Sequence, residues 1–327
     1  MTLNPTPPDR LIPDRRLQKA IKVGLVAGGL GTYWPQFPNL LPQLQSSARF
    51  VSEQIGKMDV ELVDVGFISD AQEGAVAAEK LRAAGCDLIV MFLTTYMTSS
   101  MVLPIAQRSS SPVLVINLQP TEQMDHANFD TGAWLAYCGA CPLPEVANAF
   151  ERAGVPFRSV SGFLHEDRAW KKIYSWIQAA SVKSILRNSR HGIMGHLYPG
   201  MLDTSTDMTM VTTHFGGHME VLEFDDLRVR VEKVSEKEVD KVLDEARAIF
   251  EIDKSVVEED FRWAGKVAVG LRQLVDEFDI NSLAYYHRGL EGEIHERLGA
   301  GMILGCSLLT AEGVPAVGEY ELRTSIG

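Results

Sequence analysis

From residue 21 onward, apolar runs of strand length alternate with segments whose apolar residues recur at helical spacing. The apolar positions of residues 39–56 and the alanine-rich residues 71–85 predict helices, and Gly85 is a natural helix-ending residue. Continuous apolar strands that alternate with helices are typical of a parallel sheet covered on both faces. The pattern therefore predicts an α/β domain over residues 18–187, with strands in IKVGLVAGG, DVELVDVGF, CDLIVMFL, SPVLVINL and FRSVSGFL.

A second series of strands and helices begins near Arg190 and predicts a second domain over residues 188–327. Its expected strands are HGIMG, HMEVLEF and INSLAYYH. Its expected helices include residues 235–250, with Ser235 as the N-cap, and an apolar segment that ends at Gly313. The fold class is thus α/β, with two domains that are each a mostly parallel sheet with helices on both faces (Rossmann/flavodoxin-like).

The two ends of the chain differ from this regular pattern. Residues 1–17 are rich in proline and carry no apolar stretch, so we expect a flexible arm and neither a signal peptide nor a membrane anchor. The final residues, GVPAVGEYELRTSIG, read as a strand, a turn and the start of a helix whose apolar face has no partner. We therefore expect the natural chain to continue beyond Gly327 into a third, C-terminal domain.

Composition and charge narrow the class of protein. Hydrophobic residues make up 46% and charged residues 23% of 327, as in ordinary globular proteins. The formal charge of −12 disfavours nucleic acid and anionic membrane surfaces as partners. Four cysteines in so long a chain do not form a disulfide framework, and the longest apolar runs are too short to span a membrane. We expect a cytoplasmic protein.

Ligands of parallel sheets lie at the carboxyl ends of strands, so the loops after Ala27, Leu93 and Leu118 are the first places to search. Gly29 and Gly31 follow the first strand, but Trp34 stands where a dinucleotide fingerprint has its third glycine. A tight turn is therefore favoured over nucleotide binding. The aromatic side chains of Tyr33 and Trp34 could stack on the face of a sugar.

Two cysteines, a histidine and a glutamate are further candidates for a functional site. Cys138 and Cys141 have the spacing of a redox or zinc pair but lack a second pair, so coincidence is the favoured interpretation. His287 ends a predicted strand at its carboxyl edge. Glu319 follows the apolar segment VPAVG, and a carboxylate at the end of a buried strand is costly unless a metal or a proton partner compensates it. We expect Glu319 to be held out of bulk water.

One segment near the end resembles a known family. GCSLLTAEGVPAVGEYELRT is similar to the stretch of L-arabinose and L-fucose isomerases in which an apolar helix, a Gly-x-Pro turn and a short strand deliver a Gly-Glu pair. The similarity extends in order over residues 20–327, through VAGGLGTYWP, VMFLTTYMTSSMVLPI, INLQP and MGHLYPGMLDTSTD.

The resemblance implies a metal-dependent aldose–ketose isomerase that acts through an enediol. Glu319 matches the glutamate that binds a divalent metal, usually manganese, and exchanges a proton with the substrate; the remaining ligands are expected beyond Gly327. The resemblance also implies a homo-oligomer with active sites shared between subunits. The implied substrate-contact residues are Thr32, Tyr33, Gln119, Met201 and His287.

His287 departs from the family, because arabinose isomerases place an aromatic residue at this strand end. The difference suggests a sugar other than arabinose. Two alternatives stay open. A non-catalytic sugar-binding protein of two α/β domains has the same order of elements, and a metal-dependent sugar epimerase shares the enediol step.

Overall fold

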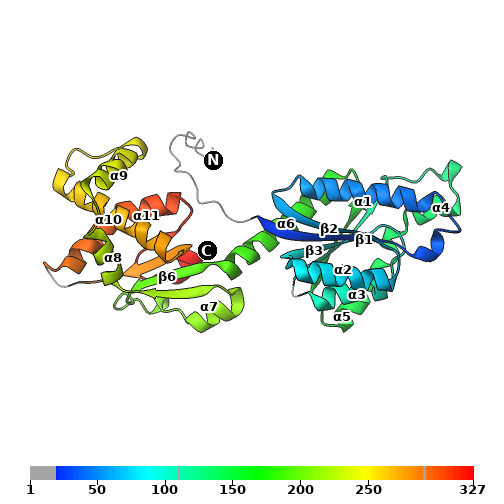
Figure 1. Ribbon diagram of the computed structural model, residues 1–327, viewed down its shortest axis with the longest axis horizontal. Coiled ribbons are helices and arrows are strands. Elements are labelled where there is room, and N and C mark those ends of the chain that lie inside the picture. The colour runs from blue at the N-terminus through cyan, green and yellow to red at the C-terminus, as the bar shows by residue number, and fades with distance from the viewer. Residues whose placement is uncertain (1–19, 110, 290–291) are drawn as a thin grey trace. The chain divides into compact units, whose positions relative to one another are not determined.

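The computed structural model describes residues 20–109, 111–289 and 292–327 (Figure 1). They form two compact units, residues 20–184 and 185–327, and each unit is described by itself. The division falls within α6 (Asp167–Asn188). The boundary expected near residue 187 stays a prediction, and the expected arm of residues 1–17 lies outside the described residues.

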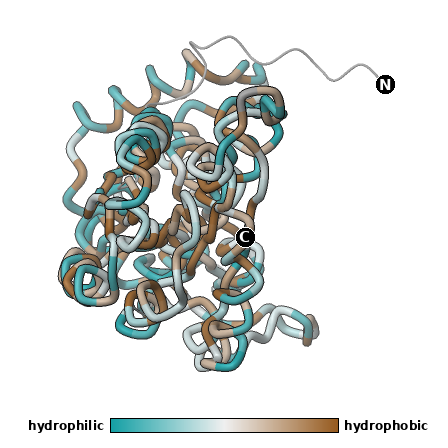
Figure 2. Tube along the Cα trace, turned by 90° about the vertical axis from the view of Figure 1, so that its right-hand side faces the viewer, coloured by the Kyte–Doolittle hydropathy of each residue, from teal (hydrophilic) through white to brown (hydrophobic). Residues whose placement is uncertain are grey.

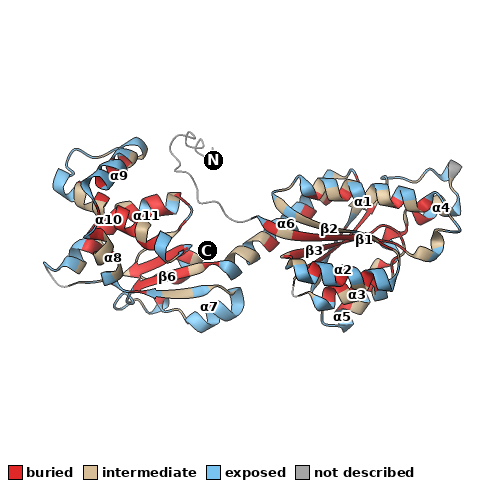
Figure 3. Ribbon diagram, viewed as in Figure 1, coloured by how far each residue is buried: buried red, intermediate tan, exposed pale blue. Residues whose placement is uncertain are grey.

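The first unit is built on a five-stranded parallel sheet in the order β2-β1-β3-β4-β5. The inner strands are almost fully buried, and every residue of β3 is (Figure 3). Burial on both faces explains why these strands are continuous apolar runs. The strands are β1 (Ile21–Gly28), β2 (Val60–Ile68), β3 (Leu88–Leu93), β4 (Val113–Gln119) and β5 (Phe157–Phe163).

Helices cover both faces of this sheet. One face packs against α1 (Leu40–Gly56) and α6. The other face packs against α2 (Ala71–Ala84), α3 (Ser99–Arg108) and α5 (Leu143–Arg152). Figure 2 shows hydrophobic and hydrophilic residues alternating along the helical turns, as expected for helices with one buried side. Short elements complete the unit: η2 (Gly31–Tyr33), η3 (His126–Asn128), α4 (Thr131–Leu135) and η4 (Cys138–Ala140).

The second unit contains a four-stranded parallel sheet in the order β7-β6-β8-β9. The strands are β6 (Arg190–Gly195), β7 (His218–Leu222), β8 (Ser282–Tyr286) and β9 (Ala316–Val317). One face packs against α8 (Phe224–Val231), α10 (Glu258–Glu277) and α11 (Ile294–Ala311), and the other against α12 (Leu322–Ile326). The remaining elements are η5 (Leu202–Thr204), α7 (Met208–Phe215) and α9 (Glu236–Ile249).

The predicted fold class is confirmed: the chain is α/β, with two parallel sheets flanked by helices. Two short helices, α7 and α8, did not follow from the apolar pattern, because each has only eight residues. His214 lies in α7 and His218 begins β7, and both are exposed. Among the described residues, no helix is long and apolar enough to cross a membrane.

Both sheets reverse their strand order at one place. In the first sheet β2 lies on one side of β1, and β3 and β4 follow on the other; β7, β6, β8 and β9 repeat this arrangement. In open α/β sheets, ligands bind in the crevice at such a reversal, which here lies outside the carboxyl ends of β1 and β3 and outside those of β6 and β8. The fold thus directs attention to the residues that follow these four strands.

A buried histidine at the start of the second sheet makes the stability of that unit depend on pH. The His191 side chain is 2% exposed, and its Nδ1 lies 2.8 Å from the Ser282 hydroxyl. Burial lowers the pKa of His191, so the folded unit favours the neutral imidazole. The unfolded chain takes up a proton near pH 6.5, and stability is therefore lost as the pH falls through that value.

The variant His191→Gln removes this titration. Between pH 7.5 and 5.5 the unmodified protein is expected to lose up to about 1.4 kcal/mol of unfolding free energy per pH unit more than the variant. Urea unfolding at both pH values measures this difference. His214→Gln, at an exposed position of α7, is the matched control and should leave the pH dependence unchanged. Equal pH slopes for the unmodified protein and His191→Gln would contradict the assignment.

Candidate functional site

The crevice of the first sheet is lined by the turn that follows β1. An added Cβ at Gly29 would lie 2.4 Å from Thr95 Cγ2, so only glycine allows β1 and the segment after β3 to approach so closely. The Trp34 indole donates a hydrogen bond of 3.1 Å to the Ser69 hydroxyl. This bond ties the turn after β1 to the end of β2 and holds the η2 segment over the sheet edge.

Tyr33 lies half-buried in this turn. Burial raises the pKa of its phenol, and the neighbouring Cys138 and Tyr96 raise it further. The Tyr33 phenol therefore stays protonated at neutral pH and can donate a hydrogen bond. A protonated hydroxyl on an aromatic ring suits a neutral polyhydroxylated ligand, which needs both a donor and an apolar face.

The two cysteines lie at the same edge, in and after η4. Cys138 is buried, Cys141 is exposed, and both are free thiols. Burial, together with the Cys141 thiol, raises the pKa of Cys138 to about 12. Reactive cysteines have lowered pKa values, so Cys138 lacks the thiolate character that disulfide exchange or metal binding needs.

Three histidines surround the crevice of the second sheet. His196 follows β6 and His287 follows β8, and their ring centroids are 5.7 Å apart. His295, in the first turn of α11, lies 5.3 Å from His287. The Phe224 ring packs against His287 with a centroid distance of 4.5 Å. An aromatic and imidazole-rich cluster therefore occupies the place where the fold predicts a ligand.

The three imidazoles differ in their surroundings. Burial lowers the pKa of His287, and neighbouring His295 and His196 lower it further. His287 is therefore neutral at pH 7 and offers one ring nitrogen as donor and one as acceptor. His295 is different, because its Nε2 lies 3.0 Å from the Asp225 carboxylate. The sequence did not reveal His196 or His295 as site residues; the only signal was that His196 directly follows a strand.

Glu319 follows β9, which is the strand next to β8 and therefore one strand away from His287. Its φ is +60° and that of Tyr320 is +65°, so two consecutive non-glycine residues are left-handed. Each such residue costs about 1–3 kcal/mol, and strain of this kind is concentrated at functional sites. The amide N–H of Tyr320 donates to the Tyr285 carbonyl at 3.0 Å, which ties the turn to β8.

The expectation that Glu319 is held out of bulk water is wrong, since the residue is exposed. The left-handed turn is the reason. It directs Tyr320 inward, where the ring packs near Ile193, Ala284 and Leu322, and leaves Glu319 facing solvent. The carboxylate therefore needs no compensating partner within this chain.

Met201 lies on the same unit, in the turn before η5. The Arg323 guanidinium of α12 donates a hydrogen bond to the Asp203 carbonyl in η5. This contact joins the Met201 turn to the segment that carries Glu319. The second unit thus contains Met201, His287 and Glu319, and the first contains Tyr33, an exposed Thr32 and Gln119, which is half-buried at the end of β4.

The described residues do not fit a metal site by themselves. Among residues 20–109, 111–289 and 292–327, no group of three histidine, cysteine or carboxylate side chains could hold a metal ion. Glu319 is one potential oxygen ligand, but a divalent transition metal in a protein needs several. The expected manganese therefore stays a prediction.

Sequence comparisons relate the chain to L-arabinose isomerases. It is 21% identical over 246 residues to an L-arabinose isomerase of Nocardioides sp., covering 74% of this chain and 48% of that protein. It is 30% identical over 122 residues to an L-arabinose isomerase of Mycolicibacterium smegmatis, covering 37% of this chain and 23% of that protein. The matched region thus spans about half the length of the first relative and less of the second. No family model matches the chain.

Solved structures that match parts of the chain include a galactofuranose binding protein, at 12% identity and a TM-score of 0.24, covering 81% of this chain and 75% of that one. A periplasmic solute binding protein from Actinobacillus succinogenes 130z with bound D-allose covers 91% of this chain and 94% of its own, at 13% identity and a TM-score of 0.24. The similarity to L-arabinose isomerases is weak and partial, and the L-fucose isomerase part of the resemblance stays a prediction.

Proposed function

We propose that this chain is the sugar-binding and proton-transferring part of an aldose–ketose isomerase related to L-arabinose isomerases. The observation that carries the proposal is the strained turn at Glu319 and Tyr320. It presents a solvated carboxylate at the carboxyl edge of the sheet, one strand from His287. The weak similarity to L-arabinose isomerases supports the same reaction class.

The reaction requires a proton to move between adjacent carbons of the sugar through an enediol. A carboxylate is suited to this transfer, because it can take the proton from one carbon and return it to the next. Glu319 is the carboxylate that we assign to this step. A divalent metal, for which manganese is the expected choice, stays part of the proposal without a site among the described residues.

Recognition of the sugar is assigned to neutral polar and aromatic groups. The His287 imidazole is neutral at pH 7 and can pair with sugar hydroxyls as donor and acceptor. Thr32, Tyr33 and Gln119 remain the candidates from the first unit, and Met201 is a further candidate from the second. A homo-oligomer in which subunits share these groups is part of the proposal.

A panel of aldoses tests the function. The full-length protein is incubated with each sugar, with and without Mn²⁺, and ketose formation is measured. Conversion of at least one aldose is the expected result. Saturable binding of a sugar without any conversion would instead support a sugar-binding protein, and inversion at a single carbon without ketose formation would support an epimerase.

His287 is the residue that we expect to set the choice of sugar. Because the resemblance places an aromatic residue at this position, His287→Phe should shift the preference toward L-arabinose. The lost hydrogen bond should raise KM for the preferred sugar about 10- to 100-fold with little change in kcat. Steady-state kinetics on both sugars measure the shift. His214→Phe, at an exposed position of α7, is the control. An unchanged ratio of kcat/KM values would exclude His287 from specificity.

A further inference from the structure

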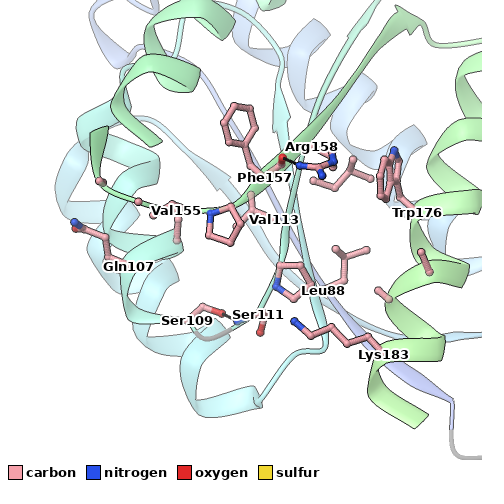
Figure 4. Close-up of a pocket in the computed structure, with 18 residues that line it drawn as sticks. Leu88, Gln107, Ser109, Ser111, Val113, Val155, Phe157, Arg158, Trp176 and Lys183 are labelled. Atoms are coloured by element: carbon pink, nitrogen blue, oxygen red, sulfur yellow. Dashed lines mark hydrogen bonds between the residues drawn. The ribbon is translucent and has the colours of Figure 1, made fainter. Parts of the chain in front are cut away.

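A large groove lies at the opposite edge of the first sheet, outside the amino ends of β3, β4 and β5. Its volume is about 760 Å³, within the usual range of small-molecule sites. Leu88, Val113 and Phe157 begin the three strands and form part of its floor. Trp176 and Lys183 reach it from α6 (Figure 4). The proposed sugar chemistry, at the carboxyl edges, does not use this groove.

The charges that line the groove are of one sign. Among the described residues that line it, Arg158 and Lys183 are the ionisable ones, although the chain as a whole carries a charge of −12. Neither has a carboxylate partner among the described residues. Arg158 donates one hydrogen bond of 2.8 Å from Nη1 to the Phe157 carbonyl, which leaves its other donors open. Asp87 directly precedes the lining residue Leu88. Its carboxylate accepts hydrogen bonds from the Lys22 amide and the Ser184 hydroxyl.

The aromatic wall of the groove lies beside one of these cations. The Arg158 guanidinium carbon is 5.6 Å from the centroid of the Trp176 ring, and the indole is partly exposed. Figure 4 shows Arg158 beside Trp176, and Lys183 extending from α6 toward Leu88 and Ser111. An apolar floor, an indole wall and two unpaired cations match a ligand that joins a flat apolar body to an anionic group.

We propose that this groove binds a small amphipathic anion, with its flat body against Trp176 and Phe157 and its carboxylate, phosphate or sulfonate attracted by the positive charges of Arg158 and Lys183. The charge complementarity carries the assignment, because an anion is the partner that two unpaired cations lack. An apolar body is required because the rest of the lining offers mostly aliphatic surface. The groove lies at the amino edge of the first sheet and shares no lining residue with the sugar site proposed above.

Naphthalene-1-sulfonate is the probe that tests this site, by isothermal titration calorimetry on the full chain. One saturable site is expected. Methanesulfonate, which lacks the body, and 1-naphthalenemethanol, which lacks the charge, should each bind at least about ten-fold more weakly. Equal binding of the probe and the neutral alcohol would overturn the proposed role of the cations.

Variants identify the groove as the place where the probe binds. Arg158→Gln and Lys183→Gln should each weaken the probe about ten-fold, and Arg158→Lys should restore part of the loss. Lys80→Gln, at an exposed position of α2, makes the same change of charge outside the groove and should have no effect. Thermal unfolding verifies that each variant is folded. The proposal is overturned if the probe does not bind, or if folded Arg158→Gln and Lys183→Gln bind it as tightly as the unmodified protein.

Discussion

Glu319→Gln is expected to reduce aldose–ketose conversion by at least about 100-fold, the lower end of what general acid–base catalysis contributes. The amide cannot accept the proton that the carboxylate takes from the sugar. Glutamine and glutamate have the same shape and equal tolerance of the left-handed conformation at this position, so the fold should be unaffected. The measurement is kcat of the full-length protein on the aldose that the panel identifies.

Glu321 provides the matched control for this variant. It lies two residues further on, at the start of α12, where its carboxylate accepts a bond of 3.3 Å from the Thr324 hydroxyl. Glu321→Gln makes the same chemical change in the same segment, and its kcat should stay within about two-fold of the unmodified protein. Near-normal turnover by Glu319→Gln would remove Glu319 from the reaction, whereas equal losses in both variants would indicate a general effect of charge.

Gly195→Ala is expected to have the largest effect on stability. Gly195 ends β6 with φ +90°, and an added Cβ would lie 1.9 Å from the Tyr286 carbonyl oxygen. The clash is with backbone, so no side-chain rotation relieves it. Strain and overpacking together should lower the free energy of unfolding of this unit by about 2–5 kcal/mol. Urea unfolding measures the loss.

The variant Gly200→Ala distinguishes the conformational cost of Gly195→Ala from the cost of its steric clash. The φ of Gly200, +91°, is nearly the same, but an added Cβ would meet nothing within 4 Å. Gly200→Ala should therefore show the conformational cost alone, about 1–2 kcal/mol. Because the amide N–H of His196 donates to the same Tyr286 carbonyl, Gly195→Ala should also displace His196 from His287 and weaken sugar binding. Equal losses in the two variants would show that the close approach at Gly195 is unimportant.

The pattern of residues by itself determined the layers of this protein. Continuous apolar runs of strand length such as Leu88–Leu93 indicate strands buried on both faces, and the helical spacing between them indicates helices that cover those faces. Local chemistry also determined several ends of elements, among them Gly85, which closes α2 with φ +64°. These features depend on residues close in sequence, and one chain is enough to reveal them.

Only the tertiary structure decided which of the strand ends meet. The strand order brings His196 and His287 to one crevice although 91 positions separate them, and it adds His295 from a helix of the same unit. It also decided that Glu319 faces solvent, because the left-handed turn gives the inward position to Tyr320. Both results depend on backbone geometry and on packing between distant segments, and neither leaves a periodic signal in the sequence.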